Sequence, residues 1–235
     1  MEALEFLRRQ LKENLERVQE RIEKALFRAG RKSGSVRLLG ASKKQSPEKI
    51  RILYELGVRL FGENYVQEGE KKIELLKDLS IEWHFIGRLQ TNKVKKALKI
   101  FQVIETLDRI ELVEEIEKRA KALNLKIPVF IEVNIGKEKS KAGILPEELK
   151  TFSEKLISYS HLVVMGLMCL PPFEENPERV RPYFAKMRAL FEEVKPLFGE
   201  YFTELSMGTS QDFEVAIEEG ATIVRLGTLL FGKRE

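Results

Sequence analysis

Eight short apolar runs alternate with stretches of helical periodicity along the whole chain, and this alternation constrains the fold most. The runs cover residues 36–42, 59–62, 83–87, 101–105, 128–134, 162–168, 204–207 and 222–227. Near-continuous apolar strands separated by helices are typical of parallel sheets that are covered on both faces. Eight such units close naturally into a barrel of about 250 residues, and this chain has 235. We therefore predict an α/β fold with a single (β/α)8 TIM-type barrel.

The segments between the runs repeat apolar residues at helical spacing. These predicted helices span residues 47–56, 65–79, 92–98, 109–122, 147–157, 178–197 and 213–218. Residues 1–30 form an additional amphipathic helix, which we expect to pack on the barrel and to fill the place of a missing eighth helix. Residues 1–235 are thus expected to form one domain with no C-terminal β domain. An open doubly wound sheet is the alternative, but no GxGxxG follows the first run.

Composition narrows the class of protein. No apolar run approaches the roughly 18 residues of a membrane span, and the N-terminus lacks the apolar core of a signal peptide. The single cysteine, Cys169, excludes a disulfide framework within the chain and is typical of the reducing cytoplasm.

No pair of His or Cys residues has metal-ligand spacing, so we predict no metal. No large exposed apolar face is required by the pattern, and we expect a monomer.

Charge gives little reason to expect a nucleic-acid partner. Lys and Arg number 41 against 37 Asp and Glu, and the two signs are interspersed along the helices. One local basic stripe, formed by Lys93, Lys95, Lys96 and Lys99, stands out. It is interpreted as a solvated helix face, with an acidic protein partner as the alternative.

The chemistry of such a barrel lies on the loops that follow its strands. The first run ends in Ser42-Lys43-Lys44, and a lysine at the carboxyl end of a barrel strand is placed to form a Schiff base with pyridoxal phosphate. Strand parity alone does not decide which of the two lysines points inward. Both remain candidates on this reasoning.

The loops after the seventh and eighth runs resemble a phosphate site. They carry glycines beside hydroxyl residues, namely Ser206, Gly208, Thr209, Ser210, Gly227 and Thr228. Exposed backbone N–H groups there would bind an anion, helped by a helix that begins near Asp212. Tight turns and helix caps are the alternative interpretation.

Three polar residues stand in or beside apolar runs. Arg225 must be paired if it is buried. Its partner is either Glu132 or the ring nitrogen of a ligand. That nitrogen would stay unprotonated, because a guanidinium only donates. His84 is either a satisfied core histidine or a site residue. Asn64 follows the second run and would bind a ring substituent or cap the next helix.

Several strings, taken together, resemble the pyridoxal phosphate homeostasis protein family. They are GASK at 40–43, FGENYVQE at 61–68, HFIGRLQTNK at 84–93, VNIGKEKSKAGI at 133–144, GLM at 166–168, LSMGTSQDFEVAI at 205–217 and VRLGTLLFG at 224–232. The resemblance implies a barrel like the N-terminal domain of alanine racemase, with pyridoxal 5′-phosphate as a Schiff base on Lys43. It implies that Asn64 lies near the ring and that Arg225 faces the pyridine nitrogen.

The same resemblance implies that Ser206, Gly208, Gly227 and Thr228 hold the phosphate. His84, Met168 and Ser210 complete the expected cofactor-binding set. Two positions depart from the family pattern. Lys44 stands where Thr is more common, and Thr209 stands where Met is common and would add a hydroxyl near the phosphate.

The expected function is to hold and supply the cofactor, as part of intracellular vitamin B6 homeostasis, without robust catalysis and without a catalytic residue. Racemases that resemble this barrel take a second acid/base group, a tyrosine, from an extra β domain across a dimer interface. Supply of the cofactor would involve recipient apo-enzymes. The alternatives are a weak amino-acid racemase or other pyridoxal phosphate-dependent enzyme, and a barrel enzyme that acts on a small phosphorylated metabolite.

Overall fold

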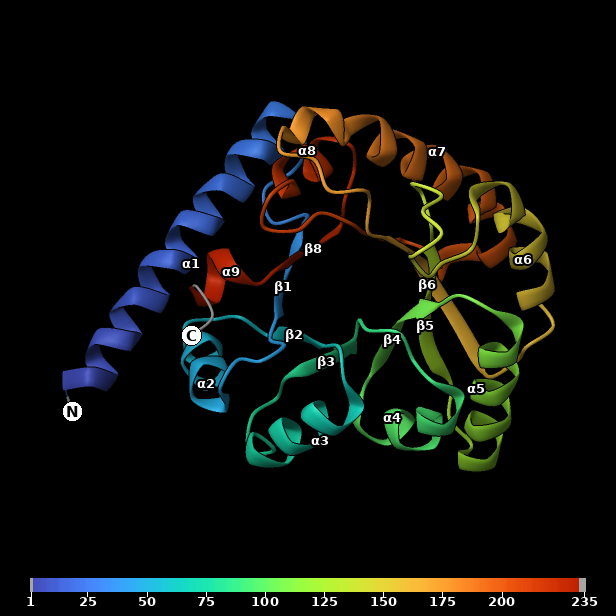
Figure 1. Cartoon of the computed structure of the whole chain (residues 1–235), viewed down its shortest axis with the longest axis horizontal. Helices are drawn as coiled ribbons and strands as arrows, with labels where there is room; N and C mark the ends of the chain where they lie inside the picture. Colours follow the sequence, from blue (N-terminus) through green and yellow to red (C-terminus); the bar gives the residue numbers. More distant parts are fainter. Residues whose placement is uncertain (1, 233–235) are drawn as a thin grey trace.

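Residues 2–232, which the computed structural model describes, form eight parallel strands that close into a barrel in sequence order (Figure 1). The strands are β1 (Arg37–Ala41), β2 (Leu60–Glu63), β3 (Glu82–Phe85), β4 (Val103–Leu107), β5 (Ile127–Val133), β6 (Leu162–Cys169), β7 (Glu204–Ser206) and β8 (Ile223–Leu226). Each overlaps one of the eight predicted runs. The predicted TIM-type barrel is confirmed.

Helices connect the strands and form an outer ring. They are α2 (Pro47–Glu55), α3 (Val66–Leu75), α4 (Val94–Ile100), α5 (Ile110–Leu123), α6 (Leu149–Leu156), α7 (Arg181–Phe198), α8 (Phe213–Glu218) and α9 (Thr228–Phe231). Single 3-10 turns lie at 91–93, 146–148, 177–179 and 199–201. The start of α2 shows why these segments are helical: the Ser46 side chain accepts the N–H of Lys49, and Pro47 occupies the first turn.

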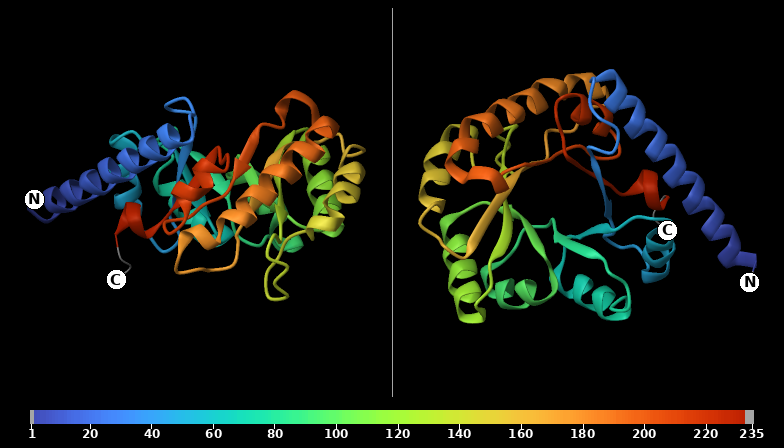
Figure 2. Two further views of the ribbon diagram at one scale, coloured as in Figure 1. Left: turned by 90° about the horizontal axis from the view of Figure 1, so that it is seen from above. Right: turned by 180° about the vertical axis from the view of Figure 1, so that it is seen from behind.

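The N-terminal helix α1 (Glu2–Arg28) occupies the expected gap in the ring. It packs against α2, α8 and α9 through one buried stripe that includes Leu11, Leu15, Val18 and Ile22. Its first turns project beyond the barrel (Figures 1 and 2). The expectation of no eighth helix needs one correction, because the single turn of α9 follows β8.

The core has two layers. One lies between the barrel and its helices, and the other fills the barrel with Leu39, Leu60, Val103, Phe130, Met168 and Ile223. The interior also holds buried polar side chains, and these include His84, Glu105 and Arg225. A barrel interior is normally filled by branched apolar residues, so buried charges there need specific partners.

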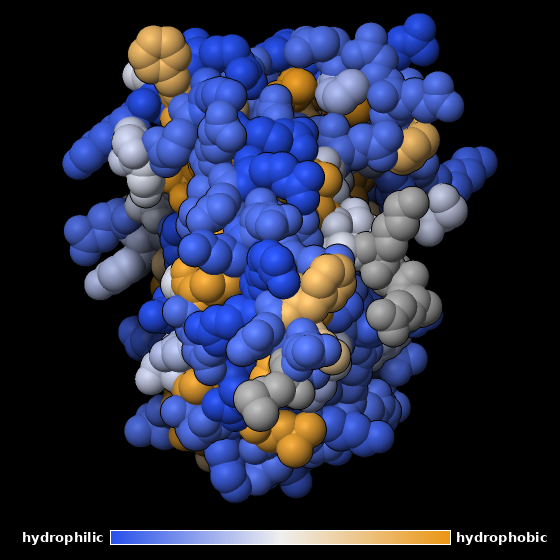
Figure 3. Space-filling view, turned by 90° about the vertical axis from the view of Figure 1, so that its left-hand side faces the viewer, coloured by the Kyte–Doolittle hydropathy of each residue, from blue (hydrophilic) through white to orange (hydrophobic). Residues whose placement is uncertain are grey.

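The face along α1 is mainly hydrophilic, with apolar side chains scattered singly over it (Figure 3). Scattered exposed apolar residues are ordinary on a protein surface. Within residues 2–232, no helix is both long enough and apolar enough to cross a membrane.

Candidate functional site

The expected site residues divide between the rim of the barrel and its interior. Strand β1 pairs with β2 on one side and with β8 on the other, and β8 pairs with β7. The loops that follow these four consecutive strands carry Lys43, Asn64, Gly208, Ser210, Gly227 and Thr228. Because the strands are parallel, all these loops meet at the same end of the barrel. One continuous half of the rim therefore holds them.

Lys43 lies in a half-buried turn directly after β1. Leu39 belongs to the interior cluster and Ala41 packs against it, and Lys43 follows two residues later in the turn after β1. The Nζ atom lies 5.1 Å from the centroid of the Tyr65 ring and has no hydrogen bond or ion pair with any described residue. Lys44 is exposed and has a φ of 61°. The two lysines therefore differ in exposure, since Lys43 is half-buried beside Tyr65 and Lys44 is exposed.

Glycine is required in the loop after β7. Gly208 has a φ of 95°, and a Cβ there would stand 2.6 Å from the Cβ of Ala216. The backbone N–H of Arg225 donates to the Gly208 carbonyl at 3.0 Å. The Ser210 hydroxyl accepts the N–H of Leu229 at 3.4 Å, so the loops that follow β7 and β8 are joined.

Thr209 is hydrogen-bonded to Asp212, which precedes α8. Its N–H and its hydroxyl both donate to Oδ1 of Asp212, at 2.6 Å and 3.2 Å. Burial raises the pKa of the Asp212 carboxyl in spite of these two bonds. The hydroxyl that Thr209 was expected to add near the phosphate thus donates to Asp212, the acidic residue that precedes α8.

Glu132, one of the two partners considered for Arg225, receives neither of its side-chain hydrogen bonds. Arg225 is buried, and its Nη1 donates to the Ser206 hydroxyl at 2.7 Å while its Nη2 donates to the Cys169 carbonyl at 2.8 Å. Ser206 in turn donates to Oε2 of Glu105 at 2.7 Å. Ser206 therefore links the guanidinium of Arg225 to the carboxylate of Glu105. The side chain of Ser206 is committed to this interior chain.

His84 extends the same chain deeper into the barrel. Its Nδ1 lies 2.5 Å from Oε1 of Glu105, and its Nε2 lies 2.9 Å from Oε1 of Glu82. Burial opposes a charged imidazole, but the bonds and charges of Glu105 and Glu82 outweigh it and raise the pKa of His84. The pKa of Glu82 falls to about 2, chiefly through its bond to His84. Of the two readings of His84, the structure places it as a buried, ion-paired core residue.

Asn64 lines a cavity of about 720 Å³ on the rim, together with Tyr65, Arg88 and Arg109. It is not the cap of the helix that follows, since Tyr65 holds that position and α3 has no side-chain cap. The Asn64 backbone packs so closely on Gly87 that a Cβ at position 87 would stand 2.1 Å from the Asn64 carbonyl oxygen.

Gly87→Ala should therefore displace Asn64 from the rim. Overpacking against backbone costs about 2 kcal/mol of unfolding free energy, and urea denaturation would measure it. If the variant unfolds at the wild-type denaturant concentration, the close approach of the two segments is not real. Gly34→Ala is a control in open space, although its φ of 74° brings some strain of its own.

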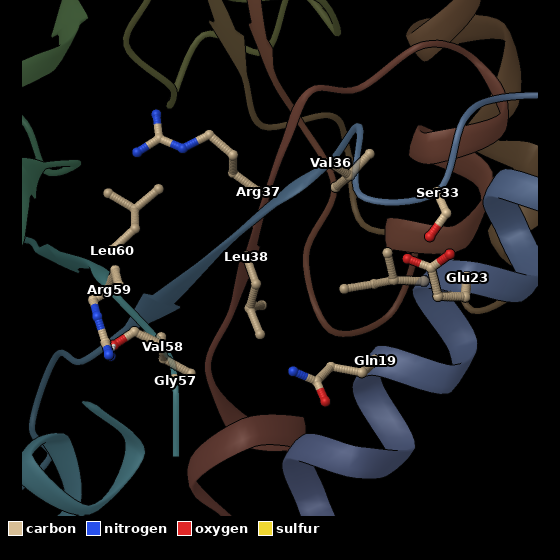
Figure 4. A pocket seen from close by; sticks show the side chains of 11 residues that line it. Gln19, Glu23, Ser33, Val36, Arg37, Leu38, Gly57, Val58, Arg59 and Leu60 are labelled. Atoms are coloured by element: carbon tan, nitrogen blue, oxygen red, sulfur yellow. Dashed lines mark hydrogen bonds between the residues drawn. The ribbon is translucent and has the colours of Figure 1, made fainter. Parts of the chain in front are cut away.

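A second cavity, of about 550 Å³, lies at the opposite end of the barrel between α1 and the starts of β1 and β2 (Figure 4). Its two arginines already have partners: Arg37 pairs with Glu82, and Arg59 donates to the Tyr54 carbonyl. No three His, Cys, Asp or Glu side chains within residues 2–232 converge to hold a metal ion. The chemistry-bearing residues gather at the rim and not here.

The family model of the alanine racemase N-terminal domain matches residues 8–235. A pyridoxal phosphate homeostasis protein of Aquifex aeolicus is 55% identical over 95% of this chain and 98% of its own. The chain belongs to the pyridoxal phosphate homeostasis protein family. A member from Haemophilus influenzae is 37% identical, with 95% and 96% of the two chains covered.

Solved structures agree with this family assignment. PipY of Synechococcus elongatus, solved with pyridoxal phosphate bound, is 32% identical with a TM-score of 0.82, over 94% of this chain and all of its own. An alanine racemase of Clostridium difficile has a TM-score of 0.74 at 15% identity, over 95% of this chain and 59% of its own. At that identity the likeness shows the shared barrel fold alone.

The residues at the rim fit the cofactor of this homeostasis family in their chemistry. A primary amine at Lys43 shares one half of the rim with the glycine- and hydroxyl-bearing loops that follow β7 and β8, and Arg225 on β8 is a buried cation held by Ser206 and the Cys169 carbonyl. Ser206, His84 and Met168 lie in the interior, where Met168 is fully buried in the apolar cluster. The expected set therefore forms a rim group and a supporting group beneath it.

Sequence reasoning missed several buried charges. Glu105 and Glu63 are fully buried, and Lys72 is 5% exposed. The side chain of Glu132, which was considered only as a partner of Arg225, has no hydrogen bond to any described residue, and burial raises the pKa of its carboxyl to about 7. The signal that drew attention to Arg225, a charge within an apolar run, also marks Glu105 in the run 101–105, and Glu63 directly follows the run 59–62. Lys72 had no such signal, because a lysine on an amphipathic helix is ordinary.

Proposed function

We propose that this chain binds pyridoxal 5′-phosphate as a reversible Schiff base at Lys43 and takes part in intracellular vitamin B6 homeostasis, without robust catalysis. Its relatives carry that name, and PipY has pyridoxal phosphate bound. The observation that carries the proposal is the half-buried Lys43, whose amine has no partner among the described residues and which shares one half of the rim with the glycine loops after β7 and β8. In this proposal the protein is a cytoplasmic monomer that serves recipient apo-enzymes.

Bound pyridoxal phosphate supplies an aldehyde that condenses reversibly with a primary amine. Lys43 supplies the amine: its nitrogen adds to the aldehyde carbon and one water leaves, and one water adds again on release. Gly208, Ser210, Gly227 and Thr228 bind the phosphate through backbone N–H groups and hydroxyls. Arg225 faces the ring nitrogen as a donor, which keeps that nitrogen unprotonated and weakens the electron-sink character of the ring.

We propose a lack of robust catalysis because the described residues near Lys43 include no second acid/base group on the opposite face. A racemase needs one such group on each face of the reacting carbon. The tyrosine beside Lys43 is Tyr65, whose ring lies under the Lys43 ammonium rather than across the barrel from it. We therefore propose that the site holds the cofactor and does not efficiently exchange protons of an amino acid.

The test compares Lys43→Ala with Lys44→Ala. Wild-type protein with added pyridoxal phosphate should show a visible absorbance band that borohydride bleaches, with the adduct located on Lys43 by mass spectrometry. Lys43→Ala should lose the band and the adduct entirely, while Lys44→Ala should keep both. A colourless wild type, or an adduct that remains in Lys43→Ala, contradicts the proposal. Racemisation of alanine at a rate typical of enzymes, a kcat of about 1 per second or more, would favour the enzyme alternative.

A further inference from the structure

One helix supports the turn of Lys43 from behind at three points. The Nζ of Lys72 on α3 donates to the Ser42 carbonyl at 2.6 Å. Glu68, one turn earlier on α3, accepts the N–H of Lys44 at 2.6 Å. Tyr65, which precedes α3, places its ring beside the Lys43 Nζ. The residues on both sides of Lys43, and its own ammonium, are thus in contact with the same element.

A buried charge cluster makes this support rigid. Lys72 also donates to Oε1 of Glu63 and to Oε1 of Glu68, both at 2.7 Å, so its ammonium has three acceptors. Glu63, on the outer face of β2, also accepts the Ser42 hydroxyl at 2.6 Å. Removing one partner from a buried charge pair leaves the other uncompensated, which is strongly destabilising. The cluster therefore strongly resists displacement of Ser42.

The backbone of the turn needs such support. Lys44 has a φ of 61°, in the left-handed region that costs a residue with a side chain about 1 kcal/mol or more. A conformation of this kind persists only where the surroundings hold it in place. Here the Lys44 N–H is held by Glu68 and the Ser42 carbonyl by Lys72. Strain stored beside a reactive lysine indicates a turn that is fixed for function.

We propose that Lys72, Glu63 and Glu68 are positioning residues for Lys43, which hold its amine at the rim before the cofactor arrives. The inference rests on the proposed function, since it assigns these residues to the attachment step. They touch the turn and not the cofactor. A preorganised amine does not need to be ordered at the moment of attachment, so the cluster strengthens binding and speeds attachment.

The first experiment follows backbone amide exchange in the ligand-free protein. Lys72→Met and Glu68→Ala should speed exchange at Lys44 about tenfold or more, since a charge-assisted hydrogen bond is worth about that factor. Glu68→Gln keeps an oxygen acceptor for the Lys44 N–H and should have a smaller effect. Lys71→Met, an exposed neighbour on the same helix, is the matched control and should match the wild type.

The second experiment measures attachment of pyridoxal phosphate by borohydride trapping and mass spectrometry of the Lys43 peptide. We expect attachment to weaken about tenfold in Lys72→Met and Glu68→Ala, less in Glu68→Gln, and not at all in Lys71→Met. If these residues only stabilised the fold, variants with equal free energies of unfolding would attach pyridoxal phosphate equally well. Glu68 is partly exposed, so its variants remain informative if Lys72→Met does not fold.

Three outcomes separate the positioning role from the proposed function on which it rests. Faster exchange at Lys44 with unchanged attachment in Glu68→Ala overturns the positioning role and leaves the proposed function intact. Exchange that no variant alters overturns it as well. A wild type that acquires no reducible adduct on Lys43 overturns the proposed function, and the positioning role falls with it.

Discussion

Glu132→Gln should raise the free energy of unfolding of the ligand-free protein by about 3 kcal/mol at pH 8. Burial raises the pKa of Glu132 from 4.5 to about 7, and each pKa unit is worth about 1.4 kcal/mol. Above pH 7 the folded protein must keep a buried carboxylate that has no hydrogen bond to a described residue, whereas the unfolded chain solvates it. Glutamine has nearly the same shape and no charge, so it removes this cost.

The pH dependence of this gain gives a sharp test. Between pH 4.5 and about 7 the folded state holds one proton more than the unfolded state at Glu132, so stability falls as pH rises through this range. The gain from Glu132→Gln should be near zero at pH 4.5, should grow up to about pH 7 and should then stay constant. Urea denaturation at several pH values would measure it, with Glu111→Gln on the exposed face of α5 as the control. An equal gain at all pH values would contradict the explanation by charge burial.

A buried carboxyl that costs stability at neutral pH, beside the barrel mouth, is typical of a residue kept for function rather than for folding. Glu132 lies on β5, diametrically opposite β1 in the closed sheet. The pKa of its carboxyl is lowered by the charges of Arg225 and Arg88 but raised more by burial and by Asp108.

His84→Ala should be among the most destabilising substitutions in the barrel, at about 3 to 5 kcal/mol. The change leaves the buried Glu105 without its imidazolium partner, and a buried charge that loses its partner has a cost of this size. His161→Ala is the matched control, because the only other histidine pairs with Glu117 near the surface, where such pairs contribute about 1 kcal/mol or less. Similar losses for the two variants would contradict the role of the interior chain.

The loss from His84→Ala should itself depend on pH. The pKa of folded His84 is raised above 6.5, so its stabilising contribution is complete below pH 6.5 and disappears as pH rises through the folded value. The pKa of folded Glu105 is lowered, so its contribution is present above pH 4.5 and disappears as pH falls through the folded value. The loss should therefore be largest between pH 4.5 and 6.5, and chemical denaturation across pH would show it. Restoring neutrality with Glu105→Gln in the same chain should recover part of the stability.

Several elements of the site follow from sequence because they depend on local pattern. Gly208 and Gly227 stand after strands, and parallel strands must bring their carboxyl ends to one edge. Lys43 and Asn64 are placed at the rim by the same rule. Strand pattern alone left Lys43 and Lys44 open, and the family resemblance implied Lys43. The structure adds that Lys43 is half-buried beside Tyr65 whereas Lys44 is exposed.

The partners of the buried charges did not follow from sequence. Glu132 and a ligand's ring nitrogen were both open for Arg225, and its guanidinium donates to Ser206 and the Cys169 carbonyl. Thr209 was expected to add a hydroxyl near a phosphate, and that hydroxyl donates to Asp212. Each of these bonds joins residues from different parts of the chain or across a turn. Periodicity along one strand carries no such information.

The sequence by itself determined the eight alternating units, the closed parallel barrel and the end at which the reactive residues gather, because period-two and helical patterns are local properties of the chain. Only the tertiary structure decided that Lys72 supports the turn of Lys43 and that His84, Glu105, Ser206 and Arg225 form one chain across the interior. Closure of the barrel sets the stagger between strands, and that stagger decides which buried side chains meet. A buried charge must then be paired with whatever partner the stagger brings within reach.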